Sequence, residues 1–162
     1  MDDIIDQFIG YVRYGSEERK EEGDLKELIQ NVVEASSKQH QGIEAVLCDL
    51  PIARYKPMAM KRLVNNLIEN AFRYGKPPVI VKTRFDEEKI IVTIRDHGKG
   101  IQVLDKKRLF QPFARGDKAR GGKGSGLGLA IVARIVEMHG GEIQLENHQE
   151  GGLEARFTVP LN

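Results

Sequence analysis

Three short segments, at residues 66–74, 96–100 and 124–129, carry the side chains and backbone groups with the clearest chemical potential. They read NLIENAFRY, DHGKG and GSGLGL: carboxamides on a helix-forming stretch, a carboxylate followed by glycines, and a glycine run before an apolar helix. Carboxamide oxygen suits Mg²⁺, a carboxylate accepts a hydrogen bond from an exocyclic amine, and free N–H groups at a helix start bind phosphate. Together, in this order, the three segments predict a site for the metal, base and phosphates of a nucleotide.

The first segment lies in a predicted helix that begins at Pro57 and ends near Tyr74. At 100° per residue, Asn66, Asn70 and Arg73 fall within about 60° of one another. Roughly the opposite side is apolar, with Met60, Leu63, Val64, Leu67 and Ala71. The polar side therefore faces a pocket, although a solvated polar face is the alternative for this helix taken alone.

The other two segments are less specific by themselves. Asp96 follows a predicted strand, and Gly98 and Gly100 would let the backbone approach a flat ligand closely. A tight turn capped by the carboxylate would use the same residues, and we expect His97 to be incidental. The glycine run is not a Walker loop, since no Lys-Ser/Thr pair follows its last glycine; a flexible hinge is its alternative.

Composition limits the class of protein. The chain has 162 residues, 40% apolar and 30% charged, which predicts one globular domain. Its 25 basic and 24 acidic residues give a net charge of +1, which argues against nucleic acid as a partner. Cys48 lies in the apolar run 43–50 and is expected to be a buried small hydrophobe. We expect neither a membrane span nor a signal peptide in the sequence as given.

The remaining elements are predicted from periodicity and from turn residues. We expect helices over 24–36, 57–74, 104–110 and 126–139, strands over 45–50, 53–56, 79–85, 89–95, 142–146 and 153–159, and a loop over 115–125. The fold class is therefore an α/β two-layer sandwich, with a mixed, mostly antiparallel sheet of about five strands covered by three helices. A Rossmann fold would need a regular β-α-β alternation that this chain lacks.

These motifs resemble the catalytic ATP-binding domain of two-component sensor histidine kinases, in the wider Bergerat-fold group that includes gyrase, Hsp90 and MutL. Residues 66–74 resemble the N box, 96–100 the G1 box, LFQPF at 109–113 the F box and 124–129 the G2 box. The wording of LFQPFARGD and GLGLAIV is similar to the EnvZ-type osmosensor kinases in particular. The resemblance divides the chain into the end of a second dimerisation helix (1–15), a charged linker (16–23) and the catalytic domain (24–162).

The resemblance also assigns roles to single residues. It implies ATP and Mg²⁺ as cofactors, with Asn70 holding the metal, Asp96 the adenine amino group and Tyr74 against the base. Asn66, Arg73 and Arg115 would act at the phosphates, and 116–123 would be a lid whose cations Lys118, Arg120 and Lys123 either bind phosphate or keep the lid soluble. The remaining implied nucleotide-binding residues are Gly98, Gly100, Ile101, Phe110, Gly124, Ser125, Gly126, Leu127, Gly128 and Leu129.

Asn66 occupies the place where the related ATPases carry a glutamate that acts on water. An amide cannot take that proton, so the sequence favours phosphoryl transfer to a side chain over hydrolysis. The alternative is that Glu69 substitutes as the base.

The acceptor is not found here, since His40, His97, His139 and His148 all lack the acceptor-box context. The implied partners are a histidine-bearing dimerisation domain and a response regulator. The implied setting is the cytoplasmic side of a bacterial membrane sensor whose parent is a homodimer, this fragment itself being monomeric. A nucleotide-gated interaction module and an anti-sigma-type serine kinase remain alternatives.

Overall fold

The computed structural model describes residues 17–101 and 128–161. In chain order these contain β1 (Glu21–Gly23), α2 (Leu25–Ser37), β2 (Ile43–Val46), β3 (Ala53–Tyr55), α3 (Pro57–Tyr74), β4 (Val79–Phe85), β5 (Lys89–Arg95), α4 (Gly128–Met138), β6 (Ile143–Asn147) and β7 (Leu153–Pro160). None of the helices in these ranges has the length and apolarity needed to cross a membrane.

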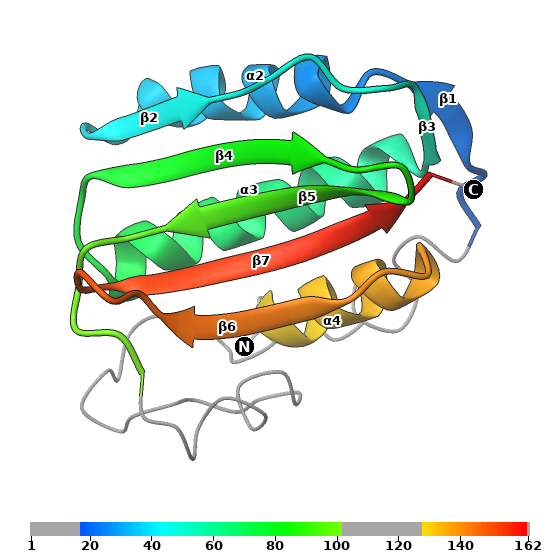
Figure 1. Cartoon of the computed structure of the whole chain (residues 1–162). Coiled ribbons are helices and arrows are strands. Elements are labelled where there is room, and N and C mark those ends of the chain that lie inside the picture. Colours follow the sequence, from blue (N-terminus) through cyan, green and yellow to red (C-terminus); the bar gives the residue numbers. More distant parts are fainter. Residues whose placement is uncertain (1–16, 102–127, 162) are drawn as a thin grey trace, which may run out of the picture.

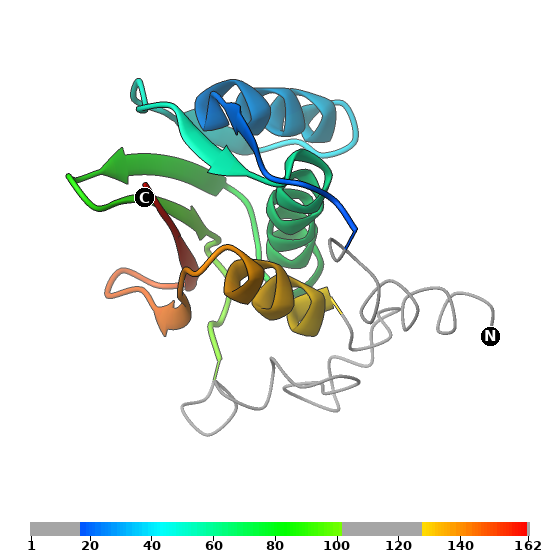
Figure 2. The same ribbon diagram turned by 90° about the vertical axis from the view of Figure 1, so that its right-hand side faces the viewer.

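Five strands form one sheet in the order β2-β4-β5-β7-β6. Strand β2 runs parallel to β4, and every other neighbouring pair is antiparallel. Helices α2, α3 and α4 all cover the same face of this sheet, as Figures 1 and 2 show from two directions. The predicted two-layer sandwich, with a mixed, mostly antiparallel five-stranded sheet under three helices, is confirmed.

The core lies between the sheet and the helices because each element has one apolar side. In β4 the inward residues Val79, Val81 and Thr83 are buried, while Lys82 and Arg84 alternate with them and are exposed. Strand β7 repeats this alternation. The buried stripe of α3 consists of Ala59, Met60, Leu63, Val64, Leu67, Ile68 and Ala71. This packing turns the opposite, polar side of α3 away from the sheet, as the spacing predicts.

Two predictions about local structure are wrong. Strand β2 covers 43–46 rather than 45–50, and Cys48 is exposed instead of buried. The strand is at the edge of the sheet, and the chain after it follows β4 as a loop, with the Cys48 N–H donating to Thr83 Oγ1 (3.1 Å) and the thiol to the Thr83 carbonyl (3.4 Å). An apolar run at a sheet edge thus need not be buried.

The stretch predicted as a linker contains a strand. Residues Glu21–Gly23 form β1, which pairs antiparallel with β3 in a separate two-stranded sheet. The predicted helix over 104–110, the loop over 115–125 and the helix remnant over 1–15 lie outside the described residues.

Candidate nucleotide site

The polar side of α3 lies beside the start of α4. Asn66 and Asn70 are half-buried, Tyr74 is half-buried and Arg73 is exposed. A Cβ atom placed on Gly128 would lie 3.8 Å from both the Oδ1 and the Nδ2 atoms of Asn70. The first and third sequence segments are therefore neighbours, although they are far apart in the chain.

The side-chain nitrogen of Asn66, on this side of α3, has no hydrogen-bond partner in the described parts of the chain. The Nδ2 atom of Asn66 is buried and makes no hydrogen bond there. Because a buried donor without an acceptor costs about 1–3 kcal/mol, such atoms in native proteins call for an explanation. A ligand oxygen that accepts from Asn66 would supply one.

The carboxylate of the second segment is deeply buried, since Asp96 is 5% exposed. Its Oδ1 atom accepts from the Gly98 N–H (2.8 Å) and the Leu153 N–H (3.2 Å), while its own N–H donates to the Leu153 carbonyl (3.0 Å). Within 17–101 and 128–161 no donor bonds to Oδ2. These contacts orient the carboxylate and leave one oxygen as an acceptor.

Two glycines bring the end of α3 against this carboxylate. Gly75 is the C-cap of α3, and a Cβ atom there would overlap the Asp96 carboxylate. A Cβ on Gly98 would lie 2.7 Å from the Gly75 Cα, which is closer than real contacts allow. The His97 N–H adds a hydrogen bond to the Lys76 carbonyl (2.8 Å). Glycine is therefore required at 75 and 98 by the protein's own packing.

Sequence reasoning missed Asn147, at the end of β6. Its Oδ1 accepts from the Ile101 N–H (2.8 Å) and its Nδ2 donates to the Ile101 carbonyl (2.7 Å). Gly100, with φ +79°, lies against the same carboxamide. Little in the sequence indicates this role, because asparagine is common where strands end and turns begin. Its effect is to fix the chain just after the G1 segment to the sheet.

The family model described as Histidine kinase-, DNA gyrase B-, and HSP90-like ATPase matches residues 55–162, which is more than half of the chain. This chain belongs to that family.

Among its relatives in this ATPase family, the sensor histidine kinase component HK1 of Mycobacterium tuberculosis is 38% identical over 104 residues, 64% of this chain and 62% of the relative. The sensor histidine kinase CpxA of Escherichia coli is 36% identical over 107 residues, 65% of this chain and 23% of CpxA. The solved histidine kinase domain of the E. coli osmosensor EnvZ is 37% identical, with a TM-score of 0.71 over 91% of this chain and 92% of that one. The chain is thus a histidine-kinase-type domain that spans 62% and 23% of these two curated relatives.

In this histidine-kinase-type domain, Glu69 lies away from the asparagines. Both of its carboxylate oxygens are 3.2 Å from His40 Nε2, and the His40 ring stacks on Phe72 with centroids 4.2 Å apart. Glu69 is therefore held toward the chain that follows α2. This arrangement disfavours the alternative in which Glu69 replaces the missing glutamate as a base.

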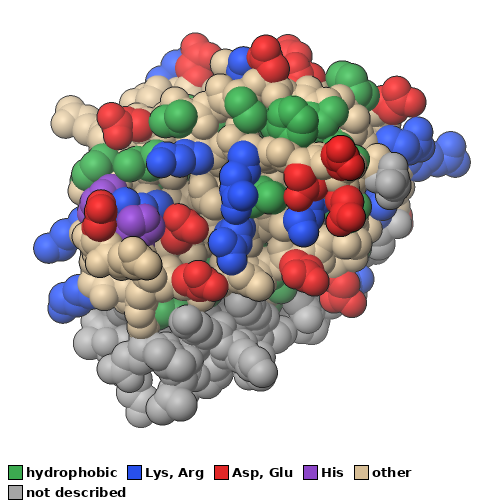
Figure 3. Space-filling view, viewed as in Figure 1, with side chains coloured by type: hydrophobic (Ala, Val, Ile, Leu, Met, Phe, Trp, Pro, Cys, Tyr) green, Lys and Arg blue, Asp and Glu red, His purple; other side chains and the backbone are tan. Residues whose placement is uncertain are grey.

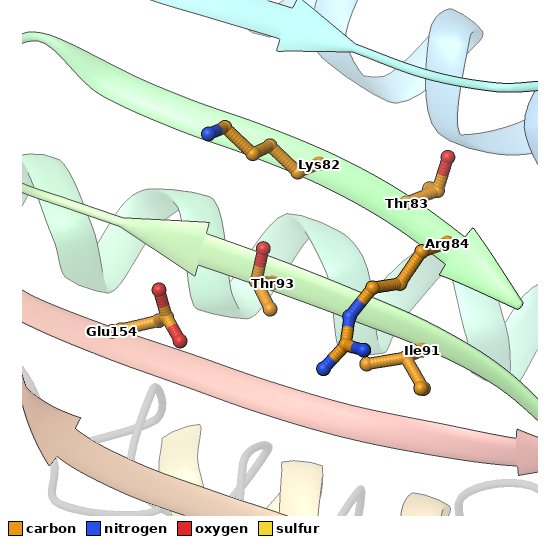
Figure 4. Close-up of a pocket in the computed structure, with 6 residues that line it drawn as sticks. All are labelled: Lys82, Thr83, Arg84, Ile91, Thr93 and Glu154. Atoms are coloured by element: carbon orange, nitrogen blue, oxygen red, sulfur yellow. The ribbon is translucent and has the colours of Figure 1, made fainter.

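A shallow hollow of about 250 Å³ lies on the other side of the sheet, which none of the helices within 17–101 and 128–161 covers. Figure 3 shows acidic, basic and apolar side chains interspersed on this face. The hollow is lined by Lys82, Thr83, Arg84, Ile91, Thr93 and Glu154 (Figure 4). Because its charges have both signs and none of its lining residues belongs to the segments 66–74, 96–100 or 124–129, we do not place the nucleotide there.

The described residues include only part of the predicted site. Ile101 is 8% exposed, Gly100 is buried, and Gly128 and Leu129 are half-buried at the start of α4. The remaining predicted site residues, Phe110, Arg115, Gly124, Ser125, Gly126 and Leu127, lie outside the described residues, as do the lid cations Lys118, Arg120 and Lys123.

Proposed function

We propose that this domain binds ATP with Mg²⁺ and donates the γ-phosphoryl group to a histidine on a separate dimerisation domain. The observation that carries the proposal is the pair of polar atoms left without partners in the described residues around the second half of α3. These are the buried donor Asn66 Nδ2 and the acceptor Asp96 Oδ2. Family membership supports ATP as the ligand.

The two atoms suit opposite ends of the nucleotide. Asp96 Oδ2 accepts from the adenine amino group, with Tyr74 against the base. Asn66 and Arg73 lie along the phosphates, and Arg115 acts near the terminal phosphate. The N–H groups at 124–129, a range that includes the first two residues of α4, hold the phosphate oxygens. Catalysis in this scheme consists of positioning and charge neutralisation, which supply most of the rate in phosphoryl transfer.

Asn70 fits a magnesium site of the kind that nucleotides bring with them. Within 17–101 and 128–161 no group of three or more His, Cys, Asp or Glu residues could hold a metal ion. Mg²⁺ binds readily through one protein oxygen, several waters and the phosphates of the substrate. The Asn70 carboxamide beside Gly128 supplies such an oxygen, and the bound ion would neutralise phosphate charge.

Position 66 favours transfer over hydrolysis. An asparagine side chain cannot accept a proton from water, and Glu69 is engaged with His40. Hydrolysis therefore lacks a base on this side of α3, and the phosphoryl group is retained until an acceptor side chain is aligned.

The names of the relatives support a wider setting. HK1 and CpxA are sensor histidine kinases and EnvZ is an osmosensor. By analogy, we place this domain on the cytoplasmic side of a homodimeric membrane sensor, with a response regulator as the next phosphoryl acceptor. The similarity of LFQPFARGD and GLGLAIV to the EnvZ-type kinases supports osmosensing as the input.

The test mixes the chain with Mg²⁺ and γ-labelled ATP, and with a separately made dimerisation domain that carries an acceptor histidine. We expect label on that domain, and none when its histidine is replaced by alanine. ATP binding without any transfer would favour a nucleotide-gated interaction module, while label on serine would favour an anti-sigma-type kinase. Release of free phosphate alone would contradict the role given to Asn66.

A further inference from the structure

Each backbone N–H group in residues 56–60, at the start of α3, has an identified hydrogen-bond acceptor. The Lys56 N–H donates to His139 Nε2 (3.0 Å), Pro57 has no N–H, and the Met60 N–H donates to the Lys56 carbonyl (2.8 Å). The two that remain, on Met58 and Ala59, are the orphan donors that every helix start must satisfy.

A single carboxylate satisfies both. Glu18 Oε2 accepts from the Met58 N–H (2.6 Å) and Glu18 Oε1 from the Ala59 N–H (3.0 Å). Helix α3 has no acidic residue in its first turn and no cap bond from its N-cap side chain. Glu18 therefore supplies both the cap and the negative charge that favours this end of a helix.

Glu18 is separated in the chain from the helix it caps. It belongs to the segment 17–23 that enters the domain, and this segment continues as β1, which pairs with β3 through three residue pairs. A Cβ on Gly23 would lie 2.6 Å from the Tyr55 hydroxyl oxygen, so the entering backbone is close to β3. Residues 19–22 are exposed. The entering segment is attached to the β3–α3 junction by the Glu18 cap, by the β1–β3 pairing and by two solvent-exposed contacts of Arg54, which donates to the Lys20 carbonyl (3.5 Å) and lies 4.0 Å from Glu22 Oε1.

We propose that Glu18 is a positioning residue, and that segment 17–23 is a releasable clamp whose docking stabilises α3 and so favours nucleotide binding. This inference rests on the proposed function, because α3 carries Asn66 and Asn70. When the segment is pulled away, the first turn of α3 loses its cap, and the asparagine side of the helix becomes less ordered. Because coupling between two sites is reciprocal, nucleotide binding must also favour docking of the segment.

The test compares Glu18→Ala with Glu17→Ala, an exposed neighbour that makes no cap bond. Amide hydrogen exchange at Met58 and Ala59 reports the clamp, and calorimetry reports ATP affinity. We expect ATP-Mg²⁺ to slow exchange at these two amides at least threefold in the wild type. Glu18→Ala should speed that exchange about tenfold without nucleotide and weaken ATP binding two- to fivefold, and Glu17→Ala should do neither. Glu18→Gln keeps one acceptor and should be intermediate.

A general loss of stability would speed exchange throughout α3, whereas loss of the clamp acts first at 58 and 59. The inference is overturned if Glu18→Ala binds ATP as tightly as Glu17→Ala, or if bound ATP leaves wild-type exchange at 58 and 59 unchanged. A wild type that binds no ATP contradicts the proposed function instead. In that case, equal amide exchange at Met58 and Ala59 in unliganded Glu18→Ala and Glu17→Ala overturns the clamp. Faster exchange at these amides in Glu18→Ala supports the part of the inference in which segment 17–23 stabilises α3.

Discussion

The two ends of α3 differ in how their polar groups are used. At the first turn, the N–H groups of Lys56, Met58 and Ala59 all donate to side chains from other elements. From the middle of the helix onward, the buried Asn66 Nδ2 has no partner in the described parts of the chain, and no donor there bonds to Asp96 Oδ2, which lies against Gly75 at the helix end. Buried polar groups are normally paired. The satisfied end is therefore where the protein holds the helix, and the unsatisfied end is where we expect a ligand.

Helix α4 contacts both ends. Its first residue, Gly128, lies beside Asn70, while His139, just after its last turn, accepts from the Lys56 N–H. Helices α3 and α4 are thus antiparallel. Helix α4 helps to hold the first turn of α3 and also lies beside the proposed ligand site. Substitutions at the ligand end should consequently change chiefly affinity, and those at the capped end chiefly stability, with only the few-fold effect on affinity expected for Glu18→Ala.

The largest effect is expected at the unsatisfied end, from Asp96→Asn. The amide keeps an Oδ1 acceptor for Gly98 and Leu153, so the free energy of unfolding should change by about 1 kcal/mol or less. It replaces the free oxygen by a donor that opposes the adenine amino group. Losing a hydrogen bond to a charged acceptor, worth about 1.5–3 kcal/mol, lowers ATP affinity roughly 10- to 150-fold.

Calorimetry with ATP and GTP checks this assignment. Wild type should prefer ATP, because a guanine carbonyl would face the Asp96 carboxylate, and Asp96→Asn should lose most of that preference. Equal affinity of the wild type for ATP and GTP would show that Asp96 does not distinguish adenine from guanine.

At the satisfied end, His139→Phe should lower stability and weaken ATP binding by no more than the few-fold expected for Glu18→Ala. His139 is 4% exposed, its Nδ1–H donates to the Ile135 carbonyl (2.7 Å), and its Nε2 accepts from Lys56. The phenyl ring leaves the Lys56 N–H without an acceptor, which costs about 1–3 kcal/mol. Thermal unfolding measures the loss, and His139→Gln, which offers an acceptor, should recover part of it.

The contribution of His139 depends on pH. Burial lowers the pKa of His139 below its ordinary value of 6.5, and the nearby Lys20 and Lys56 charges lower the pKa further. The unfolded chain then binds a proton at higher pH than the folded chain, so stability is full above about pH 6.5 and declines as the pH falls through the folded pKa. The difference between wild type and His139→Phe should shrink between pH 7.5 and 5.5. A constant difference would mean that His139 does not titrate on unfolding.

The smallest of these effects is expected from Asn70→Ala. The loss of one oxygen ligand should remove most of the Mg²⁺-dependent gain in ATP affinity, about tenfold, while metal-free binding changes little. Titrations with and without Mg²⁺ measure both values. If the variant still binds ATP more tightly with Mg²⁺ than without it, Asn70 is not a ligand of the metal.

Much of the fold was predictable because local signals mark its element ends. Pro57 and Gly75 bound α3, and β-branched alternation around 86–88 marks the β4–β5 hairpin. Strand β1 was not predictable, because Glu-Glu-Gly has no strand pattern and its partner β3 lies 30 residues further on. The same holds for Asn147, whose partner Ile101 is 46 residues away.

For the site, the residue types were predictable and their neighbours were not. The spacing along α3 predicted that Asn66 and Asn70 share a side, but nothing local placed Gly128 beside Asn70 or Gly75 against Asp96. The roles of the site residues remain predictions until ligand binding is measured.

The hydrogen bonds of the G1 segment also set the order in which the site is completed during synthesis. Asp96 is bonded to Leu153, 57 residues later, and Ile101 to Asn147. A nascent chain that has emerged only as far as α4 has both asparagines of α3 but no partner strand to orient the carboxylate. The carboxylate that we propose to select the base is thus oriented last, when β6 and β7 join the sheet beside β5.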